Sequence, residues 1–232
     1  MIRRTLGALA LLVVALPLRA QVVGHLPEQS PFEDATGRHT ASLQAGMIFP
    51  KKDRAGVGPQ SGLILMGRYE YDLPGPMWLV SRVGFAPGLT RNVKDPELTG
   101  AARDLGTTTE SMFLLDGGLV LSLTGEKSWR GIAPRVHGNL GLVSSFNSDF
   151  DAGGYRFGPK FMPSWGLAVR GVTGKDWEWY GDLTQAFWRL QYPRSYSDAG
   201  ATVSPSIIGT SKLNPWTGNY ILTVGITRVW GR

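Results

Sequence analysis

Apolar and polar residues alternate with a period of two along most of the chain after residue 38. In the last such segment the residues of one parity are apolar: Tyr220, Leu222, Val224, Ile226 and Trp230. The residues between them are polar or small: Thr223, Gly225 and Thr227. A period of two is typical of a β-strand whose two faces lie in different environments.

Eight segments carry this alternation: 40–49, 63–73, 77–90, 109–124, 129–144, 155–172, 177–192 and 219–230. Each is long enough to cross a bilayer as a tilted strand, which takes about 9–11 residues. Tight turns and long links alternate between them. The tight turns are 74–76, 125–128 and 173–175, and the long links are 50–62, 91–108, 146–154 and 193–218.

Short turns on one side and long loops on the other are typical of outer-membrane barrels, in which the short turns are periplasmic. Three inner turns and four outer loops are what eight strands require if both termini are periplasmic. The pattern therefore predicts an all-β fold over 38–232, an eight-stranded antiparallel up-and-down transmembrane β-barrel.

The N-terminal part of the chain reads differently. Residues 1–20 indicate a cleaved signal peptide, with Arg3 and Arg4 before an apolar run at 6–18 and a small residue, Ala20, before the cut. An uncleaved anchor is less well supported, because the run is shorter than the about 20 residues that span a bilayer. Residues 21–37 show no period and are expected to be a flexible periplasmic segment.

Composition narrows the possible functions. Charged residues make up only 18% of the chain, and there is no cysteine, which excludes disulfides and thiolate metal sites. The net charge of +6 falls to +3 once the three signal-peptide arginines are removed, since Arg19 is the third. That charge is too mild to indicate a nucleic-acid partner.

The ionisable residues of most strands share the face opposite to the aliphatic residues. An eight-stranded barrel is narrow and filled by side chains, and buried charges must be paired. We therefore predict an interior ion-pair network that plugs the barrel; a narrow ion pathway would need a gap between the pairs. The predicted interior residues are Arg68, Glu70, Asp72, Arg82, Glu110, Asp116, Arg135, His137, Lys160, Arg170, Glu178 and Asp182.

Two tight turns suggest how these charges pair across neighbouring strands. The turn at 125–128 predicts that Asp116 opposes His137. The turn at 173–175 predicts that Arg170 opposes Glu178. Opposite charges at directly paired positions stabilise a sheet.

The second hairpin, which joins segments 63–73 and 77–90, offers a choice of register. Glu70 opposite Arg82 is favoured over Arg68 opposite Arg82, because like charges that face each other are destabilising. Trp78 breaks the phase of its strand and is expected to point inward.

Aromatic residues gather where strands meet the short turns. They predict an aromatic girdle at the periplasmic interface, formed by Tyr69, Tyr71, Trp129, Trp177, Trp179 and Trp230. Arg228 lies on the outward face near that rim, where it can snorkel. Prolines 87, 134, 159 and 163 each remove a ladder donor, so bulges or strand ends are expected there, above all in segments 129–144 and 155–172.

The chain resembles the small eight-stranded outer-membrane barrels of the OmpA transmembrane-domain, OmpX and OmpW type over about residues 38–232. The last strand, 220–230, carries much of this resemblance, since an alternating strand that ends in an aromatic residue resembles the signal read by the barrel-assembly machinery. Here Gly231 and Arg232 follow the terminal Trp230, which departs from that pattern. The resemblance implies a bacterial outer-membrane location and contact with membrane lipids and lipopolysaccharide. We expect a monomer.

Some small barrels of this kind are lipid A or phospholipid hydrolases or acyltransferases. His137 has an acid partner in Asp116 but no serine beside it, and neither His137 nor His39 begins a His-x-Ser pattern. His25 lies in the predicted N-terminal tail. We therefore predict no catalytic residue, and a hydrogen-bonded interior role for His137.

Cofactor and metal motifs are equally weak. Asp149 and Asp151 form a fragment of an acidic calcium loop that is too short to indicate a site. Gly56 and Gly58 precede no predicted helix, so a dinucleotide site is not supported. We expect no cofactor and no metal. The basic segment 51–54 suits lipopolysaccharide phosphates, although a solubilising loop is the simpler interpretation.

The sequence thus favours an outer-membrane barrel with a charge-filled interior and a structural, envelope-integrity or surface-interaction role. A small channel or a carrier for small or hydrophobic solutes is the first alternative, and a lipid-modifying enzyme the second. A soluble periplasmic barrel that binds a ligand in its core would have apolar side chains inside, the reverse of the charge pattern here.

Overall fold

The chain forms one antiparallel sheet in the computed structural model, which describes residues 30–35, 37–146, 149–173, 176–197, 206–209 and 211–231. The predicted signal peptide, 1–20, lies outside these residues, as do positions 21–29. Residues 32–232 belong to one unit, which contains all of the strands. Its long strands are β2 (His39–Phe49), β3 (Gly62–Asp72), β4 (Met77–Lys94), β5 (Asp104–Ser122), β7 (Ile132–Ser145), β8 (Lys160–Val172), β9 (Trp177–Arg189) and β10 (Trp216–Trp230).

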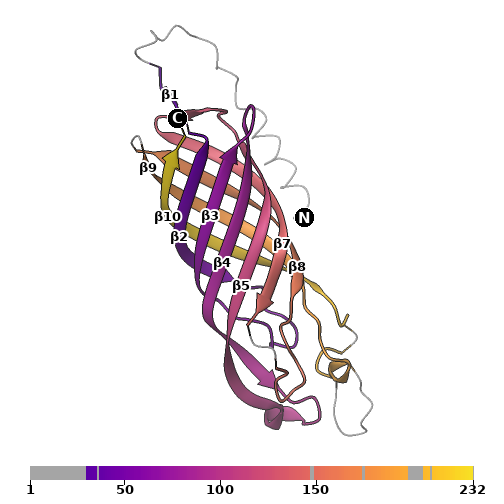
Figure 1. The fold of residues 1–232 in the computed structure, drawn as a ribbon. Coiled ribbons are helices and arrows are strands. Elements are labelled where there is room, and N and C mark those ends of the chain that lie inside the picture. Colours follow the sequence, from indigo (N-terminus) through magenta and orange to yellow (C-terminus); the bar gives the residue numbers. More distant parts are fainter. Residues whose placement is uncertain are drawn as a thin grey trace, which may run out of the picture. The chain divides into compact units, whose positions relative to one another are not determined.

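The last strand closes the sheet into a barrel by pairing with the first long one (Figure 1). The register between β10 and β2 is unbroken from Tyr220↔Phe49 to Trp230↔His39. Every other long strand pairs with the long strand that follows it. Closure leaves no free edge among the eight, so their backbone groups find partners within the wall. The predicted eight-stranded antiparallel up-and-down barrel is confirmed.

The links alternate in length as predicted. The strand ends that bound the short links, 73–76, 123–126 and 173–176, lie at one end of the barrel, and those that bound the long links, 50–61, 95–103, 146–159 and 190–215, lie at the other (Figure 1). The long links carry two short 3-10 helices, Gly100–Arg103 and Arg194–Tyr196. No helix of the described residues is long and apolar enough to cross a bilayer.

Two strands run well past their neighbours at the long-loop end. The pairing of β3 with β4 stops at Leu65↔Phe85, and that of β5 with β7 stops at Met112↔Ser145. The pairing between β4 and β5 continues to Lys94↔Asp104. Residues 89–94 and 104–110 therefore form a two-stranded ribbon beyond the barrel wall, longer than the predicted strand ends at 90 and 109 (Figure 1).

A short pair of strands decorates the opposite end. Strand β1 (Phe32–Asp34) pairs with β6 (Lys127–Trp129), so the expectation of a flexible segment over 21–37 is wrong for 32–34. The backbone N–H of Ala35 also donates to the carbonyl of Glu126, at 2.8 Å. The strand predicted at 129–144 breaks after β6, because the backbone turns through positive φ at Arg130 (51°) and Gly131 (76°).

The prolines disturb the sheet less than expected. A register shift interrupts β4 beside Pro87, and Pro159 stands just before β8, which begins later than the predicted residue 155. Pro134 and Pro163, however, lie inside an unbroken register between β7 and β8, so the expected bulges there are wrong. Each stands one residue beyond the last pair with its second neighbour, β5 or β9, where a missing N–H costs no ladder bond on that side.

The close approach of β5 and β7 leads to a testable difference between two glycines of β7. A Cβ at Gly141 would lie 2.2 Å from the carbonyl oxygen of Leu115 and 2.4 Å from the Asp116 Cβ, whereas a Cβ at Gly138 would meet nothing within 4 Å. Gly141→Ala should lower the free energy of unfolding by about 1–3 kcal/mol, because overpacking forces the backbones apart. Gly138→Ala is the matched control and should change it little. Denaturant titration in lipid vesicles measures both, and equal effects would contradict this packing.

Candidate functional site

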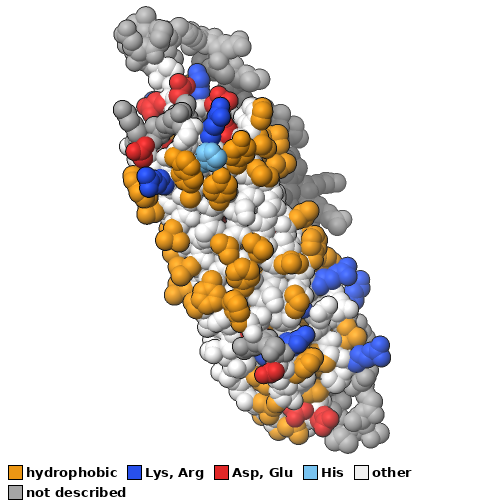
Figure 2. All heavy atoms as spheres, in the orientation of Figure 1, with side chains coloured by type: hydrophobic (Ala, Val, Ile, Leu, Met, Phe, Trp, Pro, Cys, Tyr) orange, Lys and Arg blue, Asp and Glu red, His pale blue; other side chains and the backbone are white. Residues whose placement is uncertain are grey.

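The outward side of the barrel wall is apolar and exposed. Leu43, Leu63 and Val224 are 63–67% exposed, and many other outward side chains of the strands are also exposed leucines, valines and aromatics. Figure 2 shows hydrophobic side chains over the wall and charged side chains gathered toward the two ends. Soluble monomers rarely expose so large an apolar surface, and a belt of this kind suits lipid.

The six residues predicted as a girdle are all exposed and lie near the short-turn end: Tyr69, Tyr71, Trp129, Trp177, Trp179 and Trp230. His39 joins them, since its ring stacks on Trp230 with centroids 5.7 Å apart and its Nδ1 lies 2.8 Å from the Tyr69 hydroxyl. A second group of exposed aromatics lies toward the long-loop end and was not singled out from the sequence: Phe49, Phe85, Phe161, Trp216 and Tyr220.

The inward side holds most of the predicted interior residues. Eleven of them are buried: Arg68, Glu70, Arg82, Glu110, Asp116, Arg135, His137, Lys160, Arg170, Glu178 and Asp182. Asp72, at the end of β3, is only half-buried. Arg91 is buried although the sequence placed it in a loop, because β4 continues past it.

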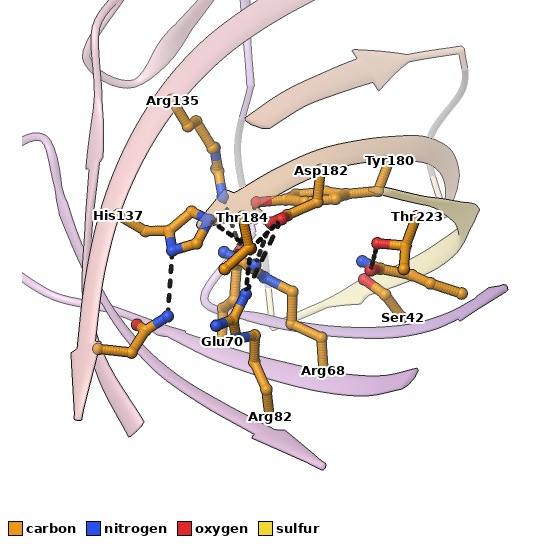
Figure 3. A network of polar contacts seen from close by, with 12 residues as sticks. Ser42, Arg68, Glu70, Arg82, Arg135, His137, Tyr180, Asp182, Thr184 and Thr223 are labelled. Carbon is orange, nitrogen blue, oxygen red and sulfur yellow. Dashed lines mark hydrogen bonds and ion pairs between the residues drawn. The ribbon is translucent and has the colours of Figure 1, made fainter. Parts of the chain in front are cut away.

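Arg68 and Glu70 lie at the centre of a polar network inside the barrel (Figure 3). The Arg68 Nε donates to a Glu70 oxygen at 2.6 Å, and its Nη1 donates to Asp182 at 2.9 Å. Arg135 donates to the other Glu70 oxygen at 2.6 Å. The Tyr180 ring lies 4.6 Å from the Arg68 guanidinium carbon. Both oxygens of Glu70 are thus used by arginines from different strands.

Arg82 extends this network toward the long-loop end. It donates to both oxygens of Asp116, at 2.8 and 2.7 Å, and to the hydroxyls of Thr184 and Ser164, at 2.8 and 3.1 Å. Bidentate pairs of this kind fix geometry as well as charge. Asp182 connects the parts, because its carboxylate also lies 3.0 Å from His137 Nε2.

A separate ion pair joins β8 to β9 nearer the short-turn end. The Arg170 Nη2 donates to Glu178 at 2.8 Å, and its Nε contacts the second Glu178 oxygen. Trp78 points inward, as its parity predicts, and its ring lies 5.5 Å from the Arg170 guanidinium and 4.8 Å from that of Arg135.

The predicted neighbour pairings need correction. Asp116 opposes Gly141 rather than His137. The acid partner of His137 is Asp182, and Asp116 pairs with Arg82 instead. The register is displaced because β6 leaves the line of β7 to pair with β1, which lengthens the turn.

Two further register predictions are wrong. Arg170 opposes Tyr180, although it still reaches Glu178 diagonally on the same face. Arg68 opposes Arg82, the register considered unfavourable. The like charges are tolerated because each guanidinium has its own carboxylate, and because the barrel is narrow enough for side chains to reach strands that are not neighbours.

An apolar layer fills the interior between the network and the long loops, and charge parity alone did not predict it. Its buried members include Ile48, Ile64, Met66, Met112, Leu114, Val143, Met162, Ala186, Trp188 and Ile221. The sequence does contain a signal for this layer, because Ile64 and Met66 have the same parity along their strand as the inward-facing Arg68 and Glu70. The interior is therefore filled by two kinds of side chain in sequence along the barrel.

The long loops fasten a cap above the apolar layer. Arg91 pairs with Glu110 at 2.8 Å and with Asp151 at 2.6 Å. Asp151 also accepts backbone N–H groups of Gly153 and Tyr155, at 2.9 and 2.8 Å. Its carboxylate is thus committed to a turn and an arginine. Among the described residues, no group of three or more His, Cys, Asp or Glu side chains is placed to hold a metal ion.

Three tyrosines pack together in this cap. Tyr192 lies between Tyr155 and Tyr196, with ring centroids 6.3 and 6.0 Å away. Its hydroxyl donates to Asp53 at 2.7 Å. Burial raises the pKa of all three phenols above the ordinary range, and for Tyr192 the hydrogen bond to Asp53 adds to that effect.

The surroundings of His137 bear on the hypothesis that the barrel is a lipid-modifying enzyme. Thr184 Oγ1 lies 3.5 Å from His137 Nε2, and its proton goes to Asp182 rather than to the histidine. All three side chains are buried inside the wall. A hydroxyl that donates to a carboxylate is not aligned with its base as a nucleophile requires.

Comparisons with known proteins bear on the fold. No protein-family model matches the chain, and no curated protein sequence matches it significantly. Among solved structures it is similar to the outer membrane protein OprG from Pseudomonas aeruginosa, with a TM-score of 0.51 and 11% identity over 88% of this chain and 100% of that one. Neisserial surface protein A (NspA) is similar with a TM-score of 0.51 and 11% identity, over 85% of this chain and 100% of that one. The likeness is one of fold.

The Arg170–Glu178 pair allows a direct test of the interior charges. Arg170→Met should lower the free energy of unfolding by roughly 3–5 kcal/mol, because it leaves a buried carboxylate unpaired. The double variant Arg170→Met/Glu178→Met should recover most of that loss. Arg228→Met, at an exposed position, is the control. Denaturant titration in vesicles measures all of them, and a double variant as unstable as the single one would refute an ion pair here.

The cap predicts a pH dependence at the alkaline side. A raised phenol pKa means that folding favours the neutral form, so this contribution is complete below about pH 10 and is lost as the pH rises beyond it. The difference in tyrosinate absorbance between the natural chain and a Tyr155→Phe/Tyr192→Phe/Tyr196→Phe variant should appear only well above pH 10. A difference that titrates at about pH 10 would show that these phenols are not buried.

Proposed function

We propose that this protein is an integral β-barrel of the bacterial outer membrane whose interior is closed, with a structural or surface-interaction role. The observation that carries the proposal is the filling of the barrel along its length. The ion-pair network, the apolar layer and the loop cap follow one another between the short-turn end and the long-loop end.

The exposed apolar wall supports the membrane part of the proposal. Many of its side chains are largely exposed to solvent, and a bilayer would supply them with apolar surroundings. The similarity in fold to OprG and NspA is consistent with this placement. We further propose that the short-turn end and both termini are periplasmic, that the signal peptide is cleaved, and that the barrel-assembly machinery inserts the chain.

The ribbon of β4 and β5 favours the surface-interaction version of the role. It extends beyond the wall, where both of its strands have lost the neighbours that pair with them in the barrel. Leu98, Leu105 and Phe150, in and beside it, are 39–67% exposed. A projecting ribbon with exposed apolar side chains is suited to contact another surface.

A channel or solute carrier would require the filled interior to open. Water or ions would have to separate Arg82 from Asp116 and Arg68 from its two carboxylates, and then pass the apolar layer. Separating a buried pair leaves charges without partners, which is costly. The proposal therefore favours a barrel that does not conduct.

Planar bilayers test this directly. The purified full chain should insert without steady single-channel conductance, and an open porin in the same bilayers is the positive control. Insertion is checked in parallel by floatation of the protein with lipid vesicles. Regular conductance steps from inserted protein would overturn the closed-barrel proposal.

A further inference from the structure

A basic cleft lies at the long-loop end, between the loop 50–61 and the loop 190–215. Its volume is about 410 Å³, and Lys51, Lys52, Arg54 and Lys212 are among the residues that line it. Trp216, the first residue of β10, lines the cleft where it meets the barrel strands. The cleft is thus positioned where the barrel wall meets the loops.

Positive charge exceeds negative charge in this cleft, because four cationic residues and one acidic residue line it. Its one acidic lining residue, Asp53, accepts hydrogen bonds from the Tyr192 hydroxyl at 2.7 Å and from two backbone N–H groups of its own loop, at 3.3 and 3.2 Å. Within the part of the chain that the structure describes, no ion pair engages the four cationic side chains. An anion would find several unneutralised donors together.

Two contacts fix parts of this cleft, the Arg54 side chain and the backbone of Lys51. The Arg54 guanidinium donates to the hydroxyl of Ser211, which ties one loop to the other across the cleft. The backbone N–H of Lys51 donates to the side-chain oxygen of Asn219 at 3.1 Å, which fixes Lys51 at the end of the wall. The fold therefore positions Arg54 and the start of the basic segment 51–54 beside the end of the barrel wall.

The apolar wall of the barrel begins at the cleft and continues along β10 toward the short-turn end. Trp216, Tyr220, Leu222 and Val224 are 48–63% exposed along the outward face of β10. On the other side of Trp216, the Arg189 guanidinium lies over its ring at 4.9 Å. From the long-loop end toward the barrel wall, the order is cations, then the aromatic Trp216, then aliphatic side chains. This order matches a molecule that has an anionic head and apolar chains.

We infer that this cleft binds the phosphorylated headgroup of an outer-leaflet lipid, whose acyl chains lie along β10. The inference rests on the proposed membrane placement, since only that orientation puts the cleft beside the outer leaflet. Arginine and lysine pair with phosphate oxygens by charge-assisted hydrogen bonds. The adjoining apolar wall selects an amphiphile over a soluble anion.

Native mass spectrometry of the full chain, released from vesicles in detergent, tests the binding. The probes are phosphatidic acid, diacylglycerol with the same chains, and free glycerol 3-phosphate. Phosphatidic acid should be retained, diacylglycerol should not, and glycerol 3-phosphate should not displace the lipid. The variant Arg54→Gln/Lys212→Gln should weaken retention by at least about tenfold, since two charge-assisted donors are lost.

The matched control is Lys94→Gln/Arg103→Gln, which removes two positive charges at the same end of the barrel, one from the ribbon and one from the 3-10 helix that joins its strands. It should retain phosphatidic acid as the natural chain does. Equal loss in both variants, equal retention of diacylglycerol, or displacement by glycerol 3-phosphate would each overturn the inference. If the protein floats with vesicles and stays silent in bilayers but shows any of these results, only the lipid site fails. If it does not float with vesicles, the proposed placement fails with it.

Discussion

The closure of the sheet is the constraint on which the rest of this structure depends. Once β10 pairs with β2, every long strand has two neighbours and the backbone polar groups of the wall are satisfied internally. Side chains alone then decide which solvent each face prefers. Because the outward face is apolar, the polar residues of the opposite parity are forced into a narrow space away from water.

That confinement accounts for the character of the interior. A buried guanidinium or carboxylate is stable only with a partner of opposite charge and with its remaining hydrogen bonds made. Glu70 and Asp182 meet this need because each pairs with two arginines from different strands, Glu70 with Arg68 and Arg135, and Asp182 with Arg68 and Arg82. The network thereby links strands that are not neighbours in the sheet. The apolar layer on the long-loop side of the network, around Trp188 and Ile221, needs no such pairing and fills the rest of the interior by packing.

The sequence predicts the parts of this fold that depend on parity and length. Alternation identifies the eight strands, the alternation of short and long links gives their order, and the parity of Trp78 places it inside. Partners are harder to predict, because they depend on register and on reach across the barrel. One excursion, β6 pairing with β1, displaces the β5–β7 register and gives His137 to Asp182 instead of Asp116.

The sequence did not predict the apolar layer, and it predicted only one side of the basic cleft, the basic segment 51–54. Ile64 and Met66 share the parity of the charged residues, but attention to charge alone hides an interior that changes character along its length. The other side of the cleft is distant in sequence, since Arg54 and Ser211 are 157 positions apart and only the folded loops bring them together. The effect of a proline on the sheet is equally hard to predict from local sequence. That of Pro134 depends on the pairing of β5 with β7, which stops at Ser122↔Arg135.

The barrel has an apolar outward face and a largely polar inward one, and β10 allows the most direct test of whether the outward face lies in lipid. The chain has no cysteine, so single cysteines for nitroxide labels can be placed along this strand without a background. In lipid vesicles, labels at Leu222 and Val224 should collide readily with oxygen dissolved in the bilayer, and labels at Ile221 and Thr223 should be protected from it. Protection that does not alternate, or ready access of a water-soluble relaxation reagent to Leu222 and Val224, would contradict a barrel with its apolar face in lipid.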